Sequence, residues 1–309
     1  MSRIAFVFPG QGAQYVGMGK DFYDNFQVCK DIFAAAKKAT GLDVEAICFE
    51  ENDKINITEY TQIAMLTVEV ALAKVLEEKG IRPEVTAGLS LGEYGALVTA
   101  GVLSVEDAFK VVRQRGILMQ EAVPTGGAMA AVLGLDGTVI AEICEKTEGI
   151  VSVANYNCPG QIVITGEEAA VDKACEALKE QGAKRCVKLN VSGPFHSAML
   201  QDAGLKLYDV LKDVSLGELK IPYLTNVTAD YVKDTDEVKE LLKKQVYSSV
   251  KWQQSVEKMI EDGIDTFIEI GPGKTLSGFM RKIDKEKKVT MFNVEKMEDL
   301  EKIAGLCQG

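Results

Sequence analysis

The feature that most constrains the fold is the stretch Val85–Leu97, in which a short apolar run leads into the pattern Gly-x-Ser-x-Gly at 88–92 and then into a helix-compatible segment. This pattern is typical of a nucleophile elbow, a sharp turn between a strand and a helix that exposes one serine hydroxyl, here that of Ser90. The two glycines leave room for a strained serine backbone and for close packing of the strand against the helix. Free backbone N–H groups at the start of the helix point toward the group that the serine attacks. The segment therefore predicts an α/β fold with Ser90 as a candidate nucleophile.

Composition limits the class of protein. The chain has 309 residues, of which 47% are hydrophobic and 26% are charged, and this suffices for one large α/β domain with or without a smaller insert. The net charge of −11 offers no broad basic face, so nucleic acid is not an expected partner. No apolar run is long enough to span a bilayer, and the run at the start is too short for a signal peptide. We expect a soluble protein with no membrane partner.

Cysteine and histidine usage indicates the compartment. The 7 cysteines form no Cys-x-x-Cys pair, and an odd number cannot all form disulfides. With only 1 histidine in the chain, no metal site is expected. We interpret the cysteines as reduced thiols, which predicts a cytoplasmic protein.

Apolar periodicity predicts a sheet with helices around it. The run at 4–8 consists of β-forming apolar residues and ends at Pro9, as expected for a buried central strand of a parallel sheet. The basic run at 281–288 is interpreted as a solvated helix end. Further helices are expected at 22–40, 58–79, 105–121, 199–211 and 237–246, and further strands at 221–226 and 266–270.

A second unit is predicted after Pro124, where the composition changes. Strands are expected at 129–133, 151–155, 161–165 and 185–191, with helices at 138–148 and 168–181. This β-α-β-β-α-β order is typical of a ferredoxin-like unit. We therefore predict a small ferredoxin-like subdomain at 126–193, inserted into a large α/β domain made of 1–125 and 194–309.

Two glycine-rich loops resemble nucleotide-binding motifs, but each lacks a glycine that its motif requires. The loop at 10–15 would need a glycine where Tyr15 stands to complete the dinucleotide pattern Gly-x-Gly-x-x-Gly. The loop at 271–275 would need a glycine at Ile268 to form a phosphate-binding loop. No bound cofactor is therefore expected.

A serine nucleophile needs a base at neutral pH, and His196 is the only histidine in the chain. A hydrolase-type triad would also need an acid between Ser90 and His196. Asp107, Asp136 and Asp172 fall on predicted helices or inside the insert, where they are poorly placed. We expect a Ser-His dyad whose histidine is oriented by a backbone carbonyl or an amide side chain.

Six segments together resemble the signatures of malonyl-CoA:acyl carrier protein transacylases. They occur in the family's order across nearly the whole chain, and the set is highly specific. The fold that the resemblance implies, an α/β-hydrolase-like domain with a ferredoxin-like insert, agrees with the predicted architecture. The segments are Phe8–Gln14, Gly88–Tyr94, Arg113–Gly116 with Met119–Gln120, Asn155–Gln161, Pro194–His196 and Glu269–Gly273.

The resemblance implies a ping-pong acyl transfer for fatty-acid biosynthesis. His196 takes the proton of Ser90, which attacks malonyl-CoA, the donor substrate, and forms a malonyl-serine ester. The phosphopantetheine thiol of acyl carrier protein, the expected partner, then receives the malonyl group. By the same resemblance, Gln11 and Leu91 supply the backbone N–H groups of the oxyanion hole, where each such donor typically matters by about 100-fold or more.

The resemblance also assigns substrate-binding residues. Arg115 binds the malonyl carboxylate, which suits a planar guanidinium because it can hold a carboxylate bidentately. Gln245 matches the family residue that orients the histidine through its main chain, and we group it with the substrate-binding residues. Asn157 and Gln62 match positions that line the pocket.

Two positions carry information on the details of the site. The family usually has a histidine just before the nucleophile, where this chain has Leu89, so a polar neighbour is lost there while the dyad and the arginine are kept. Phe195, next to the base, is bulky and would crowd a branched α-carbon. It therefore favours malonyl over methylmalonyl groups.

Three other functions remain open on the sequence. A stand-alone acyltransferase of a polyketide assembly line would share every motif, and gene neighbourhood would separate the two pathways. A serine thioesterase or hydrolase is disfavoured by Arg115 and by the missing triad acid. A non-catalytic carrier-binding module is disfavoured by the presence of both Ser90 and His196.

Candidate docking residues for an acidic carrier are Lys184, Arg185, Arg281 and Lys282. A monomer is expected because no long apolar stripe is predicted to be exposed.

Overall fold

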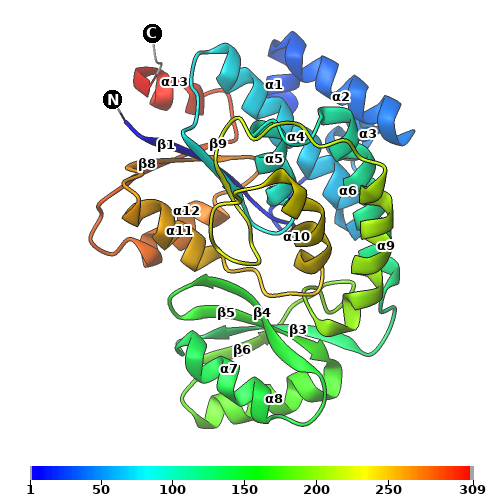
Figure 1. The fold of residues 1–309 in the computed structure, drawn as a ribbon, viewed down its shortest axis with the longest axis vertical. Helices are drawn as coiled ribbons and strands as arrows, with labels where there is room; N and C mark the ends of the chain where they lie inside the picture. The colour runs from blue at the N-terminus through cyan, green and yellow to red at the C-terminus, as the bar shows by residue number, and fades with distance from the viewer. Residues whose placement is uncertain (1, 307–309) are drawn as a thin grey trace.

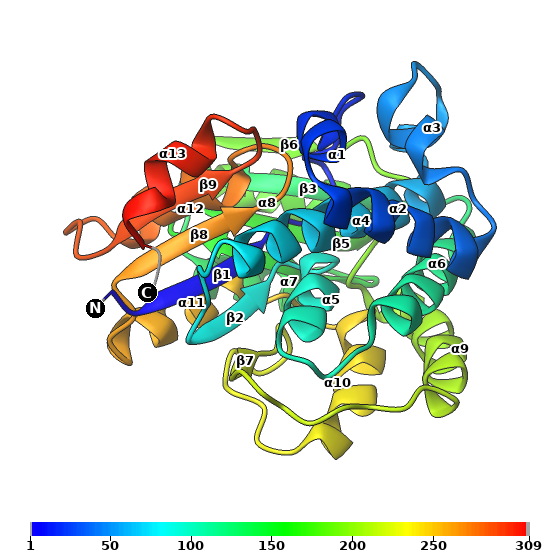
Figure 2. The same ribbon diagram turned by 90° about the horizontal axis from the view of Figure 1, so that it is seen from above.

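Two β-sheets organise the structure, a computed structural model in which residues 2–306 are described (Figure 1). The larger sheet has five parallel strands in the order β7-β2-β1-β8-β9, and Figure 2 shows β2, β1, β8 and β9 side by side. Its central strands are buried along their whole length, as their apolar sequences predict. The strands are β1 (Ile4–Phe8), β2 (Val85–Gly88), β7 (Tyr223–Leu224), β8 (Thr266–Ile270) and β9 (Thr290–Val294).

Helices cover both faces of this sheet. Along β1, Phe6 and Phe8 pack into one core and Ala5 and Val7 into a second core on the opposite face, as the alternation of side chains along a strand requires. The first core includes α4 and α6, and the second includes α11 and α12. The helices of this part are α1 (Lys20–Asn25), α2 (Gln27–Thr40), α3 (Val44–Phe49), α4 (Thr58–Glu78), α5 (Gly92–Thr99), α6 (Val105–Glu121), α9 (Gln201–Lys212), α10 (Val238–Gln245), α11 (Trp252–Glu261), α12 (Thr275–Ile283) and α13 (Asp299–Ile303), with short 3-10 turns η1 (Lys54–Asn56), η2 (Ala198–Leu200), η3 (Thr235–Glu237) and η4 (Ala304–Leu306).

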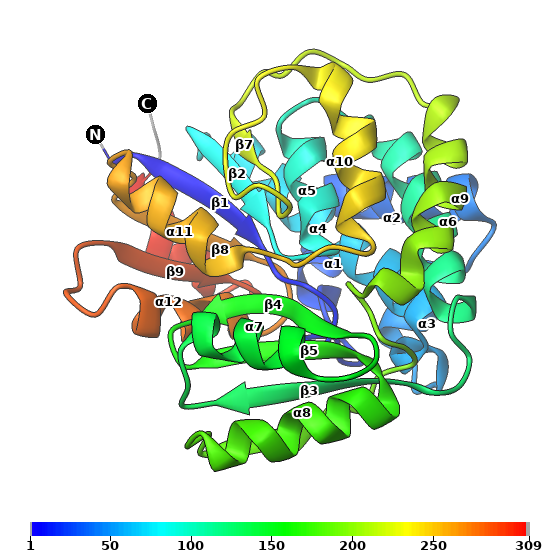
Figure 3. The same ribbon diagram turned by 60° about the horizontal axis from the view of Figure 1, so that its bottom comes forward.

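The smaller sheet is antiparallel, with the order β4-β5-β3-β6. Two helices, α7 and α8, cover the face that points away from the larger sheet (Figures 1 and 3). The β-α-β-β-α-β order predicted from the sequence is confirmed. The elements are β3 (Gly127–Leu133), α7 (Gly137–Lys146), β4 (Val151–Cys158), β5 (Gln161–Glu167), α8 (Glu168–Glu180) and β6 (Arg185–Lys188).

Several predicted boundaries are wrong by up to three residues, as for the strand expected at 185–191, which ends at Lys188, and two predicted elements were wrong over more of their length. The helix expected at 22–40 is broken at Phe26, whose extended backbone (φ −121°, ψ 128°) separates α1 from α2 while its ring stacks on Phe22 at 5.8 Å. The strand expected at 221–226 pairs only at Tyr223–Leu224. It ends there because the next residues turn back, with the Ala229 amide donating to the carbonyl of Thr225. The sequence analysis also missed α3, α11, α13 and β9, and it identified only the end of α12, within the basic run at 281–288.

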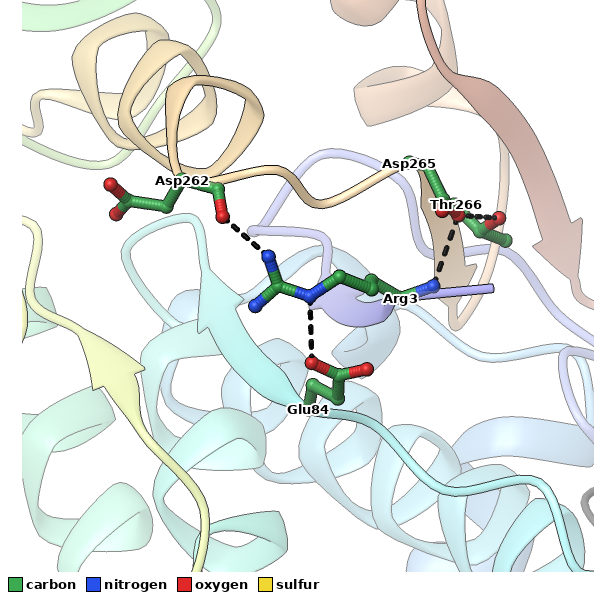
Figure 4. A network of polar contacts seen from close by, with 5 residues as sticks. All are labelled: Arg3, Glu84, Asp262, Asp265 and Thr266. Carbon is green, nitrogen blue, oxygen red and sulfur yellow. Dashed lines mark hydrogen bonds and ion pairs between the residues drawn. The ribbon is translucent and has the colours of Figure 1, made fainter. Parts of the chain in front are cut away.

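The amino-terminal ends of three parallel strands are joined by Arg3 (Figure 4). Its Nε lies 2.9 Å from the Glu84 carboxylate before β2, and its backbone amide donates to Asp265 before β8. Because both side chains of the Arg3–Glu84 pair are exposed, the pair contributes little to the free energy of unfolding. The contacts show that these strands start together, so that their carboxyl ends meet at the opposite edge, where open α/β sheets place ligands.

No helix among residues 2–306 combines the length and the apolar character needed to cross a membrane. The six cysteines within that range are free, whereas Cys307 lies outside the described residues.

Candidate active site

The nucleophile elbow lies at the carboxyl end of β2. Ser90 has a positive φ of 54°, a strained conformation for a residue with a side chain. The elbow also requires its glycines, because a Cβ on Gly88 would lie 1.9 Å from the carbonyl carbon of Gly92, and a Cβ on Gly92 would lie 2.2 Å from the carbonyl oxygen of Phe8. With α5 starting at Gly92, the turn presents the Ser90 hydroxyl above the end of the sheet.

His196 lies against the serine. The Ser90 hydroxyl is 2.8 Å from His196 Nε2, and His196 Nδ1 donates to the backbone carbonyl of Gln245 at 2.7 Å. A carbonyl only accepts, so this contact leaves Nε2 as the acceptor for the serine proton. Burial, together with the positive charge of Arg115, lowers the pKa of His196 to about 4. The imidazole is therefore neutral at pH 7 and able to act as a base.

The three aspartates considered as triad acids act elsewhere. The orienting group of His196 is a backbone carbonyl, as expected for a dyad. Within the described residues, the aspartates bind local partners instead: Asp107 accepts from Ser104, Asp136 from the Thr138 amide, and Asp172 pairs with Lys188.

Arg115, from α6, is buried at the bottom of the site. Its Nη2 donates to the Ser90 hydroxyl at 3.1 Å and to the Gln245 side chain at 3.0 Å, and its Nη1 donates to Gln62 at 2.8 Å. The guanidinium carbon lies 5.5 Å from the centre of the Tyr94 ring. Among residues 2–306 no carboxylate forms an ion pair with Arg115, and its Nε–H has no partner. A buried cation with a spare donor beside a nucleophile suits a ligand that carries a negative charge.

A cavity of about 820 Å³ joins these groups, and its size suits a small organic ligand. It lies between the carboxyl edge of the larger sheet and the uncovered face of the smaller sheet, whose Met129 and Val163 form part of its wall. Eight of the nine residues predicted for the site line it: Gln11, Gln62, Ser90, Leu91, Arg115, Asn157, Phe195 and His196. The ninth, Gln245, lies beneath the wall, fully buried.

The acyl transferase domain family matches residues 5–303. Malonyl CoA-acyl carrier protein transacylase of Bacillus subtilis is 45% identical over 293 residues, which is 93% of this chain and 92% of the relative. The chain belongs to this transacylase family. A solved transacylase from Clostridium perfringens is 47% identical with a TM-score of 0.94, over 98% of this chain and 96% of that one. A malonyl-transacylase solved in complex with its type II PKS acyl-carrier protein is 39% identical with a TM-score of 0.94, over 98% and 99% of the two chains.

Two backbone amides of this transacylase are free to donate hydrogen bonds into the cavity that contains Ser90. The N–H groups of Gln11 and Leu91 donate to no acceptor within residues 2–306, and both residues line the cavity. The Gln11 loop is held from the side, because its Nε2 donates to Thr58 at 3.0 Å and the Thr58 hydroxyl lies 2.7 Å from that of Ser192. Two free donors next to a nucleophile can stabilise an oxyanion.

Two buried residues of this transacylase site were missed by the sequence analysis. The Asn226 side chain accepts from the Ser90 amide at 2.7 Å and donates to the Gly88 carbonyl at 2.6 Å, so it bridges both sides of the elbow. Glu93 accepts from the Asn226 amide at 3.1 Å and from the Gln245 side chain at 2.7 Å. Burial raises the pKa of Glu93 to about 7. Asn226 follows a strand of the parallel sheet, and this position was the one signal in the sequence that could have indicated it.

Leu89 stands in the cavity wall of this transacylase and presents an apolar side chain there. The polar contact that a histidine would make is therefore replaced by packing against the second core.

No group of three or more metal-ligating side chains occurs among the described residues.

Proposed function

We propose that this chain transfers the malonyl group of malonyl-CoA to the phosphopantetheine thiol of acyl carrier protein, through an ester on Ser90. The observation that carries the proposal is Arg115, a buried cation with an unpaired Nε–H, in one cavity with the Ser90–His196 dyad. A hydrolase of neutral esters has no use for such a cation. The malonyl group supplies the missing carboxylate.

The first half-reaction uses the dyad directly. His196 Nε2 takes the Ser90 proton as Oγ attacks the thioester carbonyl, and the Gln11 and Leu91 amides bind the developing oxyanion. When the intermediate collapses, the C–S bond breaks and the CoA sulfur receives the proton from His196. In the second half-reaction His196 takes the proton of the phosphopantetheine thiol, the sulfur attacks the ester, and Ser90 leaves with that proton.

We infer a place in fatty-acid biosynthesis, in the cytoplasm. A polyketide assembly line is the second candidate, because one solved relative is described in complex with a type II PKS acyl-carrier protein. The ring of Phe195 lies next to His196 in the cavity wall, which supports a preference for malonyl over methylmalonyl groups. A monomer remains our prediction.

We also propose the finer fold description. Residues 1–125 and 194–309 would form an α/β-hydrolase-like domain, supported by the parallel sheet and the elbow at the end of β2. Residues 126–193 would form a ferredoxin-like subdomain, supported by the strand order β4-β5-β3-β6 and by a core of its own.

Brief mixing with malonyl-CoA should add one malonyl group to the wild-type protein and none to Ser90→Ala, because only the serine hydroxyl can form the ester. Intact mass measures the adduct. Added holo acyl carrier protein should remove the adduct and become malonylated, whereas methylmalonyl-CoA should load more slowly. No adduct, or its immediate loss to water without a carrier, would reject acyl transfer.

The pH profile of loading should have its acid limb near pH 4 instead of 6.5. His196 works only when neutral, and its pKa is lowered to about 4, so activity is kept as the pH falls through 6.5 and is lost near 4. The measurement is kcat/KM for malonyl-CoA between pH 3.5 and 8. Glu93→Gln removes the buried carboxyl that contacts Gln245 and whose pKa of about 7 also lies in this range, so a limb that stays near pH 4 in that variant does not come from Glu93. A limb at 6.5 in both proteins would contradict the assignment.

A further inference from the structure

The two faces of the smaller sheet differ in how they are covered. Ala130, Val132 and Cys186 point to the face that α7 and α8 cover. Met129 and Val163 point to the other face, where they pack into the core of the larger part of the molecule and line the cavity. The cavity wall is thus one part of this second face.

The strand register shows how far this second face extends. Ala131 pairs with Val163 on β5 and with Val187 on the edge strand β6, and Leu133 pairs in the same way with Gln161 and Arg185. Paired residues of antiparallel strands point to the same side of a sheet. The second face of the smaller sheet therefore forms the cavity wall at β5 and continues across β3 to the edge strand β6. At β6 it extends past the part of the sheet that packs against the larger part of the molecule.

This uncovered part is apolar. Val187 is 47% exposed, and Leu189 and Val191, which continue from β6 into the cavity wall, are each 37% exposed. Large apolar side chains exposed side by side next to a binding cavity mark an interaction surface. We call Ala131, Leu133, Val187, Leu189 and Val191 the open strip.

Basic residues lie at both ends of the cross-strand row formed by Gln161, Leu133 and Arg185. Lys184 and Arg185 are exposed at the start of β6, and Lys282 of α12 donates to Gln161 at 2.9 Å. Arg281 precedes Lys282 in the last turn of α12, and none of these four cations forms an ion pair with a carboxylate among residues 2–306. In a chain with a net charge of −11, unpaired cations at both ends of one apolar strip favour a partner with an acidic surface.

We propose that the open strip, with Lys184, Arg185, Arg281 and Lys282 around it, is the surface on which the acyl carrier protein docks. The inference rests on the proposed function, since an acceptor thiol attached to a protein must enter the cavity while the protein stays outside. The open strip is an apolar surface continuous with the cavity wall, and its cations complement acidic side chains of the carrier. Apolar contacts ringed by polar ones are the usual composition of such an interface.

Two substitutions test the surface, and each lies outside the cavity wall. Val187→Glu places a negative charge on the open strip, and Arg185→Glu reverses a charge at its end. The matched control is Leu205→Glu on α9, where the leucine is 48% exposed on another part of the surface. For each protein we would measure loading from malonyl-CoA, transfer to a holo acyl carrier protein that the wild type malonylates, and transfer to free pantetheine.

We expect KM for the carrier to rise about 10-fold in each strip variant, which corresponds to about 1.4 kcal/mol. Loading, transfer to pantetheine and the Leu205→Glu control should keep wild-type values. The effect of Arg185→Glu should shrink at high salt. Wild-type KM for the carrier in both variants would overturn the docking surface, as would an equal loss in transfer to pantetheine. Failure of the wild type to load or to transfer would instead reject the proposed function.

Discussion

His196→Ala should lower kcat/KM for malonyl loading by about three orders of magnitude. The substitution removes the acceptor 2.8 Å from the Ser90 hydroxyl, and among residues 2–306 no other base contacts that hydroxyl. Arg115 Nη2, its other neighbour, only donates. Rapid-mixing intact mass, or release of free CoA in the first turnover, measures the loss.

The backbone of His196 requires a second variant as control. Its φ of 60° is left-handed, so alanine there is strained and lowers stability for a reason unrelated to the chemistry. Asparagine tolerates this conformation and carries no base. His196→Asn should therefore keep a Tm closer to the wild type and still lose loading. A wild-type loading rate in both variants would show that another group takes the serine proton.

Arg115→Ala should lower the malonyl-to-acetyl preference by about 100-fold, because only the malonyl group has a carboxylate to bind the guanidinium. The variant also leaves the Gln62 and Gln245 oxygens without their donor, so its absolute rates fall for both substrates. The preference is therefore measured as a ratio, with both CoA esters competing in one mixture and the two adducts separated by mass. Structural losses common to both substrates cancel in this ratio.

Arg115→Lys provides the intermediate case. Lysine keeps the positive charge and loses the planar fork, so we expect a preference between those of the wild type and the alanine variant. An unchanged preference in Arg115→Ala would mean that other groups select the acyl chain, and it would remove the main support for malonyl as the substrate.

Both predictions depend on a buried polar network that holds the reacting groups. Gln245 contacts the dyad through its carbonyl and Arg115 through its side-chain oxygen, while its Nε2 donates to the Ser90 carbonyl and to Glu93. Such a network is stable only when most of its members are satisfied, which these contacts achieve. Glu93 joins this network through Gln245 and, among residues 2–306, forms no ion pair with Arg115, which leaves the guanidinium available for a ligand.

Local chemistry explains why much of the site could be predicted from the sequence. The elbow requires glycines at fixed spacing around Ser90, so its geometry is encoded within a few residues. The order of the six elements between 127 and 188 follows from apolar periodicity in the same way. His196 was identifiable because the chain contains 1 histidine and a serine nucleophile needs a base.

The contacts that could not be predicted join residues far apart in the chain. Asn226 bridges an elbow 136 residues away, and Glu93 meets Gln245 across 152 residues. Short-range patterns also misjudged where elements end: the break at Phe26 and the early end of β7 depend on what the neighbouring segments pack against.

The sequence by itself thus determined the candidate nucleophile, its base and the order of the six elements between 127 and 188, because each depends on residue type and short-range spacing. Only the tertiary structure decided that Asn226 and Glu93 support the elbow and the Gln245 side chain, and that one face of the smaller sheet stays partly open beside the cavity. These features arise from strand register and from packing between distant segments, which no local pattern specifies.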